Sequence, residues 1–305
     1  EILAQGIKSP YPAVQIASLQ FLAKMQDDRC DELLNSAMSS PVFGVRMEAG
    51  FYLAQRKHPK ASGQIESLMY KIPHPFWVYF PQFFALLGTK DSLIVLKKLM
   101  EDSLSFIRVE AILSAARYGR DDLASKIRAH ATHHSLDEQE AAAFALGLLQ
   151  DSSSINILKR LANSKEENVQ LAAAKALYTL GDLSQLETII SLAEKKNLFA
   201  IGELAYFTEG TNSLIKLLKD PSPHVRFNAA LSLLHHKNPL ALTELKKILV
   251  CDAKDLGLQP IFSPGRSFLA WKVIPSISQK IQLNAPIDLR ALTEQIKNQI
   301  VVDRK

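Results

Sequence analysis

The chain has 305 residues, of which 47% are hydrophobic and 22% are charged, and its formal net charge is +5. A chain of this length buries enough apolar surface to fold without disulfide staples, and two cysteines, Cys30 and Cys251, exclude a disulfide framework. Its apolar runs stay below the roughly 18 to 20 residues of a membrane span, so we expect no helix that crosses a membrane.

Apolar residues recur along the chain with a constant step of 31 residues. Six positions lie on this step: Val14, Val45, Phe76, Ile107, Glu138 and Val169. All of them except Glu138 are apolar. Around them, apolar residues with helical spacing fall in paired segments of about 10 and 15 residues. A fixed period made of paired helices predicts a stack in which each pair needs its neighbours for burial. We therefore predict an all-α fold, a right-handed α-solenoid.

The predicted helices follow in a regular order. Residues 1–8 form the end of a first helix, and Ser9 and Pro10 open a second one that reaches about Met25. The following helices are expected at residues 31–38, from Ser40 to about 57, and at 64–71, 91–100, 103–118, 123–131, 136–149, 155–162 and 166–180. Residues suited to the left-handed turn past a helix end keep the same step: Gly88, Gly119, Gln150 and Gly181. Acids that we expect to cap the next helix follow them at Asp121, Asp151 and Asp182.

The third repeat differs from the others. Residues 73–88 hold five Phe or Trp residues together with Tyr79, and Pro81 falls where the inside of a helix is expected. A proline inside a helix costs about 3 kcal/mol and kinks it. Either packing of the aromatic rings or a functional bend is then needed to offset that cost.

The regular step shortens after Gly181. Residues 186–193 and 198–207 form a clipped pair, and helices at 214–219, 227–236 and 240–250 restore the pattern. Residues 251–279 lose it, and residues 287–301 form a closing amphipathic helix. We expect one elongated domain, with a repeat array of about eight helix pairs over residues 1–250 and an irregular C-terminal cap over residues 251–305.

The motif around the step resembles HEAT repeats. A loop Asp, then Val or Ile five residues later, Arg and an Ala-rich helix stand as Asp102…Ile107-Arg108 and Asp220…Val225-Arg226, and Val45-Arg46 follows Ser40 in the same way. The short step is most similar to the bacterial repeats named after phycobilisome lyases. The resemblance covers about residues 9–250 and implies a binding scaffold. It also implies a structural ladder between neighbouring repeats, made here of Asp102, Arg108, Asp220, Arg226 and Arg46.

We expect a protein or peptide partner to bind in a concave groove along the second helices. The residues that this arrangement would turn outward include the candidate contacts Phe51, Trp77, Tyr79, Gln82, Glu110, Leu113, Arg117 and Phe144. Aromatic anchors of this kind are favoured at interfaces. The alternative is that the same side chains are buried between adjacent repeats.

Other chemistry has weaker support in the sequence. His130 and His134 have a spacing that suits a metal, but a place at a helix end favours solvated or capping histidines, and we expect no metal and no cofactor. No phosphate loop or nucleophile elbow is present, so we expect a non-enzymatic protein. The alternatives are a nucleic-acid binder that uses basic pairs on the first helices and, third, a bilin lyase. The cysteine content favours a reducing compartment and thus the cytoplasm, while Glu1 in place of Met indicates a trimmed chain.

Overall fold

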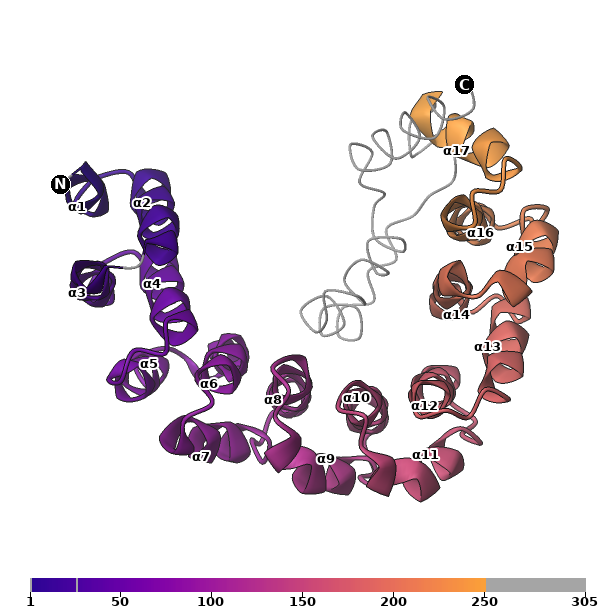
Figure 1. Cartoon of the computed structure of the whole chain (residues 1–305), viewed down its shortest axis with the longest axis horizontal. Coiled ribbons are helices and arrows are strands. Elements are labelled where there is room, and N and C mark those ends of the chain that lie inside the picture. The colour runs from indigo at the N-terminus through magenta and orange to yellow at the C-terminus, as the bar shows by residue number, and fades with distance from the viewer. Residues whose placement is uncertain (1, 26, 251–305) are drawn as a thin grey trace. The chain divides into compact units, whose positions relative to one another are not determined.

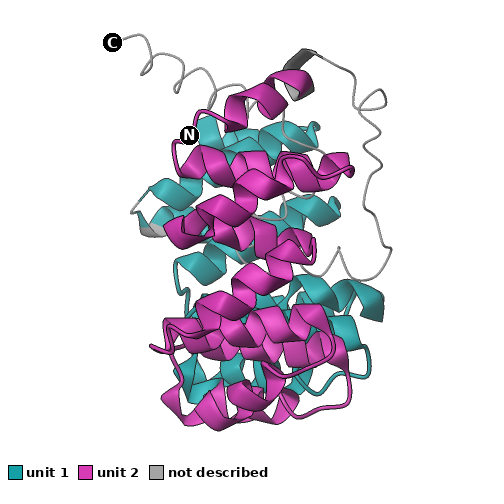
Figure 2. Cartoon of the chain, turned by 90° about the vertical axis from the view of Figure 1, so that its right-hand side faces the viewer, with its two compact units in different colours: residues 1–123 teal, residues 124–305 magenta. Residues whose placement is uncertain are grey.

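The computed structural model describes residues 2–25 and 27–250, and all regular structure within these ranges is helical. The expected cap over residues 251–305 lies outside the described residues. The chain divides into two compact units, residues 1–123 and residues 124–305, which Figure 2 shows in different colours. In the ribbon of Figure 1, each unit is a two-row stack of antiparallel helices, as expected for a stretch of α-solenoid.

The first unit pairs short first helices with longer second helices. Its elements are α1 (Ile2–Ile7), α2 (Pro12–Lys24), α3 (Asp28–Ala37), α4 (Phe43–Gln55), α5 (Ala61–Met69), the 3-10 helix η1 (His74–Tyr79), α6 (Pro81–Leu87), α7 (Lys90–Leu99), α8 (Ser105–Arg117) and η2 (Asp121–Leu123). The second helices contact each other in the order α2, α4, α6 and α8. A continuous row of packed helices therefore runs through this unit.

The second unit repeats the same plan. Its elements are α9 (Ala124–His130), α10 (Leu136–Leu148), η3 (Ser152–Ser154), α11 (Ile155–Leu161), α12 (Glu167–Thr179), α13 (Gln185–Glu194), α14 (Leu198–Glu203), η4 (Leu204–Tyr206), η5 (Thr208–Gly210), α15 (Thr211–Leu217), α16 (Pro223–His235) and α17 (Ala241–Val250). Helices α10 and α12 pack together, and so do α14 and α16. Its core includes a cluster of apolar side chains from α12 to α17, with Phe227 almost fully buried.

The predicted step of 31 residues is confirmed in the helix boundaries. Helices α2, α4, α8, α10, α12 and α16 are all 13 residues long, and the residue of the apolar step, or its equivalent Val225, is the third residue of each. The predicted left-handed residues Gly88, Gly119, Gln150 and Gly181 all have positive φ, and Lys57 adds one more at the same step. The step lasts until Leu198, which begins α14, and shortens only afterwards, with α16 starting 25 residues later (223 − 198).

Three expectations about the third repeat and the first one are corrected. Pro81 begins α6 instead of lying inside a helix, because the second helix of this repeat is split into η1 and α6. At the first position of a helix the missing N–H has no intrahelical partner anyway, so the proline costs little. Val14 and Phe76 are on the apolar step but are 44% and 48% exposed, whereas Val45 is fully buried.

Candidate functional site

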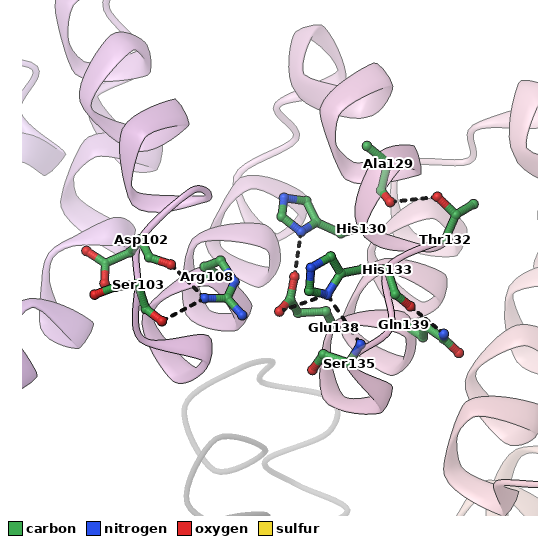
Figure 3. A network of polar contacts seen from close by, with 10 residues as sticks. All are labelled: Asp102, Ser103, Arg108, Ala129, His130, Thr132, His133, Ser135, Glu138 and Gln139. Atoms are coloured by element: carbon green, nitrogen blue, oxygen red, sulfur yellow. Dashed lines mark hydrogen bonds and ion pairs between the residues drawn. The ribbon is translucent and has the colours of Figure 1, made fainter.

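Five of the loops before second helices are closed by a residue six positions further along the chain. The side-chain N–H groups that donate to the loop carbonyl are, with their distances, Gln15 to Ser9 (2.5 Å), Arg46 to Ser40 (2.6 Å), Arg108 to Asp102 (2.6 Å), Gln139 to His133 (2.5 Å) and Arg226 to Asp220 (2.8 Å). Figure 3 shows two of these loops, at Asp102 and at His133. The expected ladder arginines thus donate to loop carbonyls of their own repeats, and Gln takes this role in two others. Arg226 also reaches the next repeat, because its Nε lies 3.5 Å from the carboxylate of Glu244 on α17.

The loop side chain itself completes the turn. The Asp102 carboxylate accepts the N–H of Leu104 at 2.9 Å, and the Asp220 carboxylate accepts the N–H of Ser222 at 2.8 Å. Such a bond fixes the chain just before a helix begins. By contrast, Asp151, which we expected to cap a helix, pairs with Arg128 at 2.6 Å.

The loop carboxylates also reach back to the preceding repeat. Asp102 lies 2.9 Å from His74 Nε2, and Asp220 lies 2.9 Å from Lys196 Nζ. Burial would raise the pKa of Asp220, but the Lys196 ammonium and the Ser222 N–H together lower this pKa below its ordinary value of 3.8. A lower pKa in the folded state means that folding favours the ionised form of Asp220. Asp220 therefore links its repeat to the preceding one through the ion pair with Lys196.

Asp220→Asn is expected to reduce the free energy of unfolding by about 1 kcal/mol at pH 7, because Asn keeps the turn but loses the ion pair. Because the pKa of Asp220 is lower in the folded state than in the unfolded state, its ion pair stabilises the protein above pH 3.8. This stability is lost as the pH falls through the folded-state pKa. The difference between wild type and variant should therefore vanish below that range. Urea titrations at pH 7 and pH 2.5 measure it. Lys196→Gln should match Asp220→Asn, and the double variant should lose no more than either one.

A buried carboxylate stands where the other positions of the apolar step carry Val, Ile or, in the third repeat, Phe. Glu138 is fully buried, and its carboxylate lies 2.8 Å from His130 Nδ1 and 3.4 Å from His133 Nδ1 (Figure 3). The His134 ring lies against that of His133, with ring centroids 4.0 Å apart and 36° between their planes. Among the residues that the structure describes, no three His, Cys, Asp or Glu side chains form a group that could hold a metal. His130 compensates the buried Glu138 and closes the end of α9 onto α10.

The aromatic side chains of the third repeat form the most distinctive surface in the first unit. Trp77 is half-buried, with Tyr70 and His74 against it in edge-on geometry at centroid distances of 5.1 and 4.7 Å. Phe76 and Tyr79 stack at 6.4 Å with only 14° between their planes, and nearly half of Phe76 is exposed. We name Phe76, Trp77 and Tyr79 the aromatic patch. Sequence reasoning missed Phe76, because its place on the apolar step predicted a core residue.

The outward column expected along the second helices is only partly accessible. Glu110 and Leu113 are 2% and 4% exposed, so neither presents a surface to a partner, contrary to the sequence prediction. Every residue of α8 from Val109 to Ala116 is buried, because Ala and Ser at many of these positions let neighbouring helices approach closely. Phe51, Gln82 and Arg117 are half-buried. Phe51 packs on Phe83 at 5.9 Å, which favours an inter-repeat contact for its ring.

In the second unit, Phe144 belongs to a chain of contacts across successive second helices. The Lys175 ammonium on α12 lies 5.7 Å from the centre of the Phe144 ring on α10. The same ammonium lies 2.8 Å from the carboxylate of Glu203 on α14, which is almost buried. A cation held between a ring and a carboxylate is well compensated. Phe144 therefore links neighbouring repeats, although its ring stays partly exposed.

The basic pairs proposed for a nucleic-acid alternative are exposed on first helices. They are Lys97 with Lys98, Lys159 with Arg160, Lys195 with Lys196 and Lys246 with Lys247. Most occupy the last turn of their helix or its cap, where positive charge is favoured by the helix dipole. Lys196 and Lys247 pair with Asp220 and Glu244. Local electrostatics therefore accounts for these lysines without a nucleic acid.

Comparisons with known proteins agree with the repeat architecture. The HEAT repeats family matches residues 131–199, and the single HEAT repeat matches residues 211–235. No curated protein matches the sequence. Among the residues described, no helix is both long and apolar enough to cross a membrane.

Several solved structures resemble the chain distantly. One is the complex of CpcE and CpcF of phycocyanin lyase from Nostoc sp. PCC7120, with 16% identity over 80% of this chain and 91% of that one, and a TM-score of 0.33. An engineered protein shares 15% identity over 97% and 98% of the two chains at a TM-score of 0.39. The Escherichia coli protein YibA shares 17% identity over 98% and 91% at 0.27. Because all three scores are below 0.5, these likenesses say nothing about function. The two family matches show HEAT repeats over residues 131–199 and 211–235, and the helix pairs and loop motif elsewhere in the described residues follow the same plan.

Proposed function

We propose that the chain is a non-enzymatic scaffold that binds a protein or peptide through the face formed by its second helices. The aromatic patch of Phe76, Trp77 and Tyr79 is the proposed anchor in the first unit. HEAT repeats form rigid helical frameworks, and such frameworks commonly present side chains to protein partners. A stacked aromatic pair with one ring half exposed is the observation that carries this proposal, because aromatic anchors dominate binding energy at interfaces.

The architecture of the third repeat supports the proposal. The second helix of this repeat is split into η1 and α6, and the aromatic residues Phe76, Trp77 and Tyr79 lie in η1. A regular 13-residue helix would instead turn Phe76 inward. Trp77 contributes mainly by packing: its indole nitrogen is shielded from water and has no acceptor among the described residues. Trp77 therefore packs with Tyr70 and His74, and Phe76 and Tyr79 supply the contact area.

Phe76→Ala with Tyr79→Ala is expected to weaken partner binding about tenfold or more, because two aromatic contacts are removed. The partner is first identified by affinity capture from native extract with mass spectrometry, then purified and titrated by calorimetry. Tyr206→Ala is the matched control, since Tyr206 is an equally exposed aromatic residue of the second unit. Undiminished binding by the double variant would reject the aromatic patch. Capture that disappears after nuclease treatment would instead favour the nucleic-acid alternative.

A further inference from the structure

A polar cavity of about 270 Å³ lies in the second unit, between α13 and the first turn of α12. One lining residue comes from α12 and the others from α13 and its C-terminal cap; together they are Gln170, Glu187, Thr188, Ser191, Leu192 and Lys195. Leu192, which is 1% exposed, gives the cavity an apolar floor. Pockets for cofactors and drug-sized molecules are larger and mainly apolar. This cavity therefore suits a polar segment that lies across it.

Gln170 occupies the position that closes the loop in other repeats. Arg46, Arg108 and Gln139 donate to the carbonyl six positions earlier, which for Gln170 would be the carbonyl of Ser164. Among the described residues, the Gln170 side chain makes no such bond and lines the cavity instead. An amide without a structural bond is available to a ligand, both as a donor and as an acceptor.

The charged and hydroxyl groups on α13 are available in the same way. Glu187, Ser191 and Lys195 follow each other at intervals of four residues, so they lie along one face of the helix. Their side chains are exposed, and within the part of the chain that the structure describes none of them has a hydrogen-bond or ion-pair partner. The neighbouring Lys196, by contrast, pairs with Asp220. The helix dipole favours an acid at the start of α13 and a base at its end, but it leaves both charges without a counterion.

The spacing of the two charges selects the kind of ligand. Lys195 follows Glu187 by eight residues, which places their Cα atoms about 12 Å apart along the helix axis. The two charges of a free amino acid lie too close together to match this separation. An extended chain rises about 3.3 Å per residue and returns to the same side at every second residue, so side chains four positions apart span about 13 Å on one side. A basic and an acidic side chain at that spacing match the carboxylate and the ammonium.

The uncharged groups favour an extended chain over a helix. A helix satisfies its own backbone N–H and C=O groups, whereas an extended segment leaves these groups open. Gln170, Thr188 and Ser191 offer an amide and two hydroxyls, which donate to carbonyls and accept from N–H groups. The cavity thus provides partners for a short stretch of backbone between the two charged contacts.

We propose that this cavity binds an extended peptide segment of a partner protein, with a basic side chain at Glu187 and an acidic side chain four positions away at Lys195. Gln170, Thr188 and Ser191 bind the backbone between these two side chains. The site lies in the second unit and uses a first helix, whereas the aromatic patch lies in the first unit. Either proposal can therefore fail without the other.

Three fluorescein-labelled peptides test the spacing of the charges. The first has the core Arg-Thr-Ala-Thr-Glu, in which the threonines disfavour a helix, and the second, Glu-Thr-Ala-Thr-Arg, tests the opposite chain direction. The control, Thr-Ala-Arg-Glu-Thr, has the same composition but adjacent charges. Each peptide is titrated against the full chain by anisotropy, and amide chemical shifts of the isotope-labelled protein locate the contact. We expect saturable binding of at least one spaced peptide, about fivefold or more tighter than the control, with shifts at α13 and Gln170.

Charge reversal at Glu187 should exchange the preferred peptide. In Glu187→Lys both ends of the cavity are positive, so the peptides with spaced Arg and Glu should bind about fivefold or more weakly, and the core Glu-Thr-Ala-Thr-Glu should become the preferred one. Glu32→Lys is the matched control, because Glu32 is an exposed acid on a first helix, α3, of the first unit and gives the same change in net charge. It should leave both affinities unchanged.

Two glutamine variants separate peptide binding from loop closure. Gln170→Ala should weaken the preferred peptide about threefold and leave the urea midpoint unchanged, because its amide closes no loop. Gln139→Ala should lower the urea midpoint and leave the peptide affinity unchanged, because Gln139 donates to the carbonyl of His133 at 2.5 Å. Circular dichroism of each variant confirms that the helices are kept.

Three results would overturn the proposal. Absence of saturable binding, or equal binding of the spaced and adjacent-charge peptides, would show that the cavity does not recognise the spacing of the charges. An unchanged preference in Glu187→Lys, or the same change in Glu32→Lys, would assign the binding to the overall charge of the protein. A lower urea midpoint with unchanged affinity in Gln170→Ala would show that Gln170 acts in its loop and not in the site.

Discussion

His130→Ala is expected to lower the free energy of opening helices α9 and α10 by about 3 kcal/mol, the largest single loss that we predict. Glu138 is fully buried, and His130 lies 2.8 Å from its carboxylate with a side chain that is only 11% exposed. Removal of the His130 side chain takes away the 2.8 Å contact of this fully buried carboxylate, which leaves the carboxylate less well compensated. Native-state hydrogen exchange of the α9 and α10 amides measures the loss where it arises.

Two further variants separate this explanation from simple loss of packing. His133→Ala should cost less than about 1 kcal/mol, because this side chain is one-third exposed and lies 3.4 Å from the carboxylate. Adding Glu138→Val to His130→Ala should recover most of the loss, since Val45 and Val169 show that this position accepts Val. A double variant as unstable as His130→Ala would show that the charge of Glu138 is not the cause.

Gly147→Ala is expected to destabilise the second unit by about 2 kcal/mol, although alanine is the better helix former. The added Cβ would lie 2.6 Å from both Cα and Cβ of Ala176, and one of those atoms is backbone that cannot rotate away. Helices α10 and α12, which pack along their length, must therefore move apart. Urea unfolding followed by circular dichroism should show a lower midpoint.

Gly63→Ala on α5 is the control with the opposite sign. A Cβ at Gly63 meets nothing within 4 Å, so alanine brings only its higher helix propensity and should stabilise the protein by about 0.5 to 1 kcal/mol. Equal shifts of the two variants in the same direction would mean that propensity alone decides, and that the close approach of α10 to α12 carries no energy.

The helical stack was predictable from the sequence because its signal is periodic. A step of 31 residues placed Val45, Ile107 and Val169 at the third position of equal helices, and Gly88, Gly119 and Gly181 at left-handed turns. These features depend on local sequence patterns that recur in successive repeats. The same periodicity also identifies the loop residue and the donor six positions after it. It does not predict that the arginines donate to the loop carbonyl of their own repeat.

The accessible surface was harder to predict, because it depends on what lies against each repeat. Glu110 and Leu113 have the spacing of an outward column, yet small neighbours let adjacent helices close over them. Phe76 and Val14 have the spacing of core residues and are exposed, one because the helix is split and the other because no described repeat precedes α2. Periodicity defines positions within a repeat but not which of them a neighbour covers.

Each loop hydrogen bond closes within its own repeat, from Gln15 to Ser9 through to Arg226 to Asp220. Excision of residues 133–163 would therefore join the loop ahead of α12 to the end of α9 and leave every remaining loop bond intact. Duplication of such a block would likewise create a complete new loop. Gene rearrangements in whole multiples of 31 codons are thus structurally tolerated, and arrays of this kind can change length during evolution without redesign of their turns.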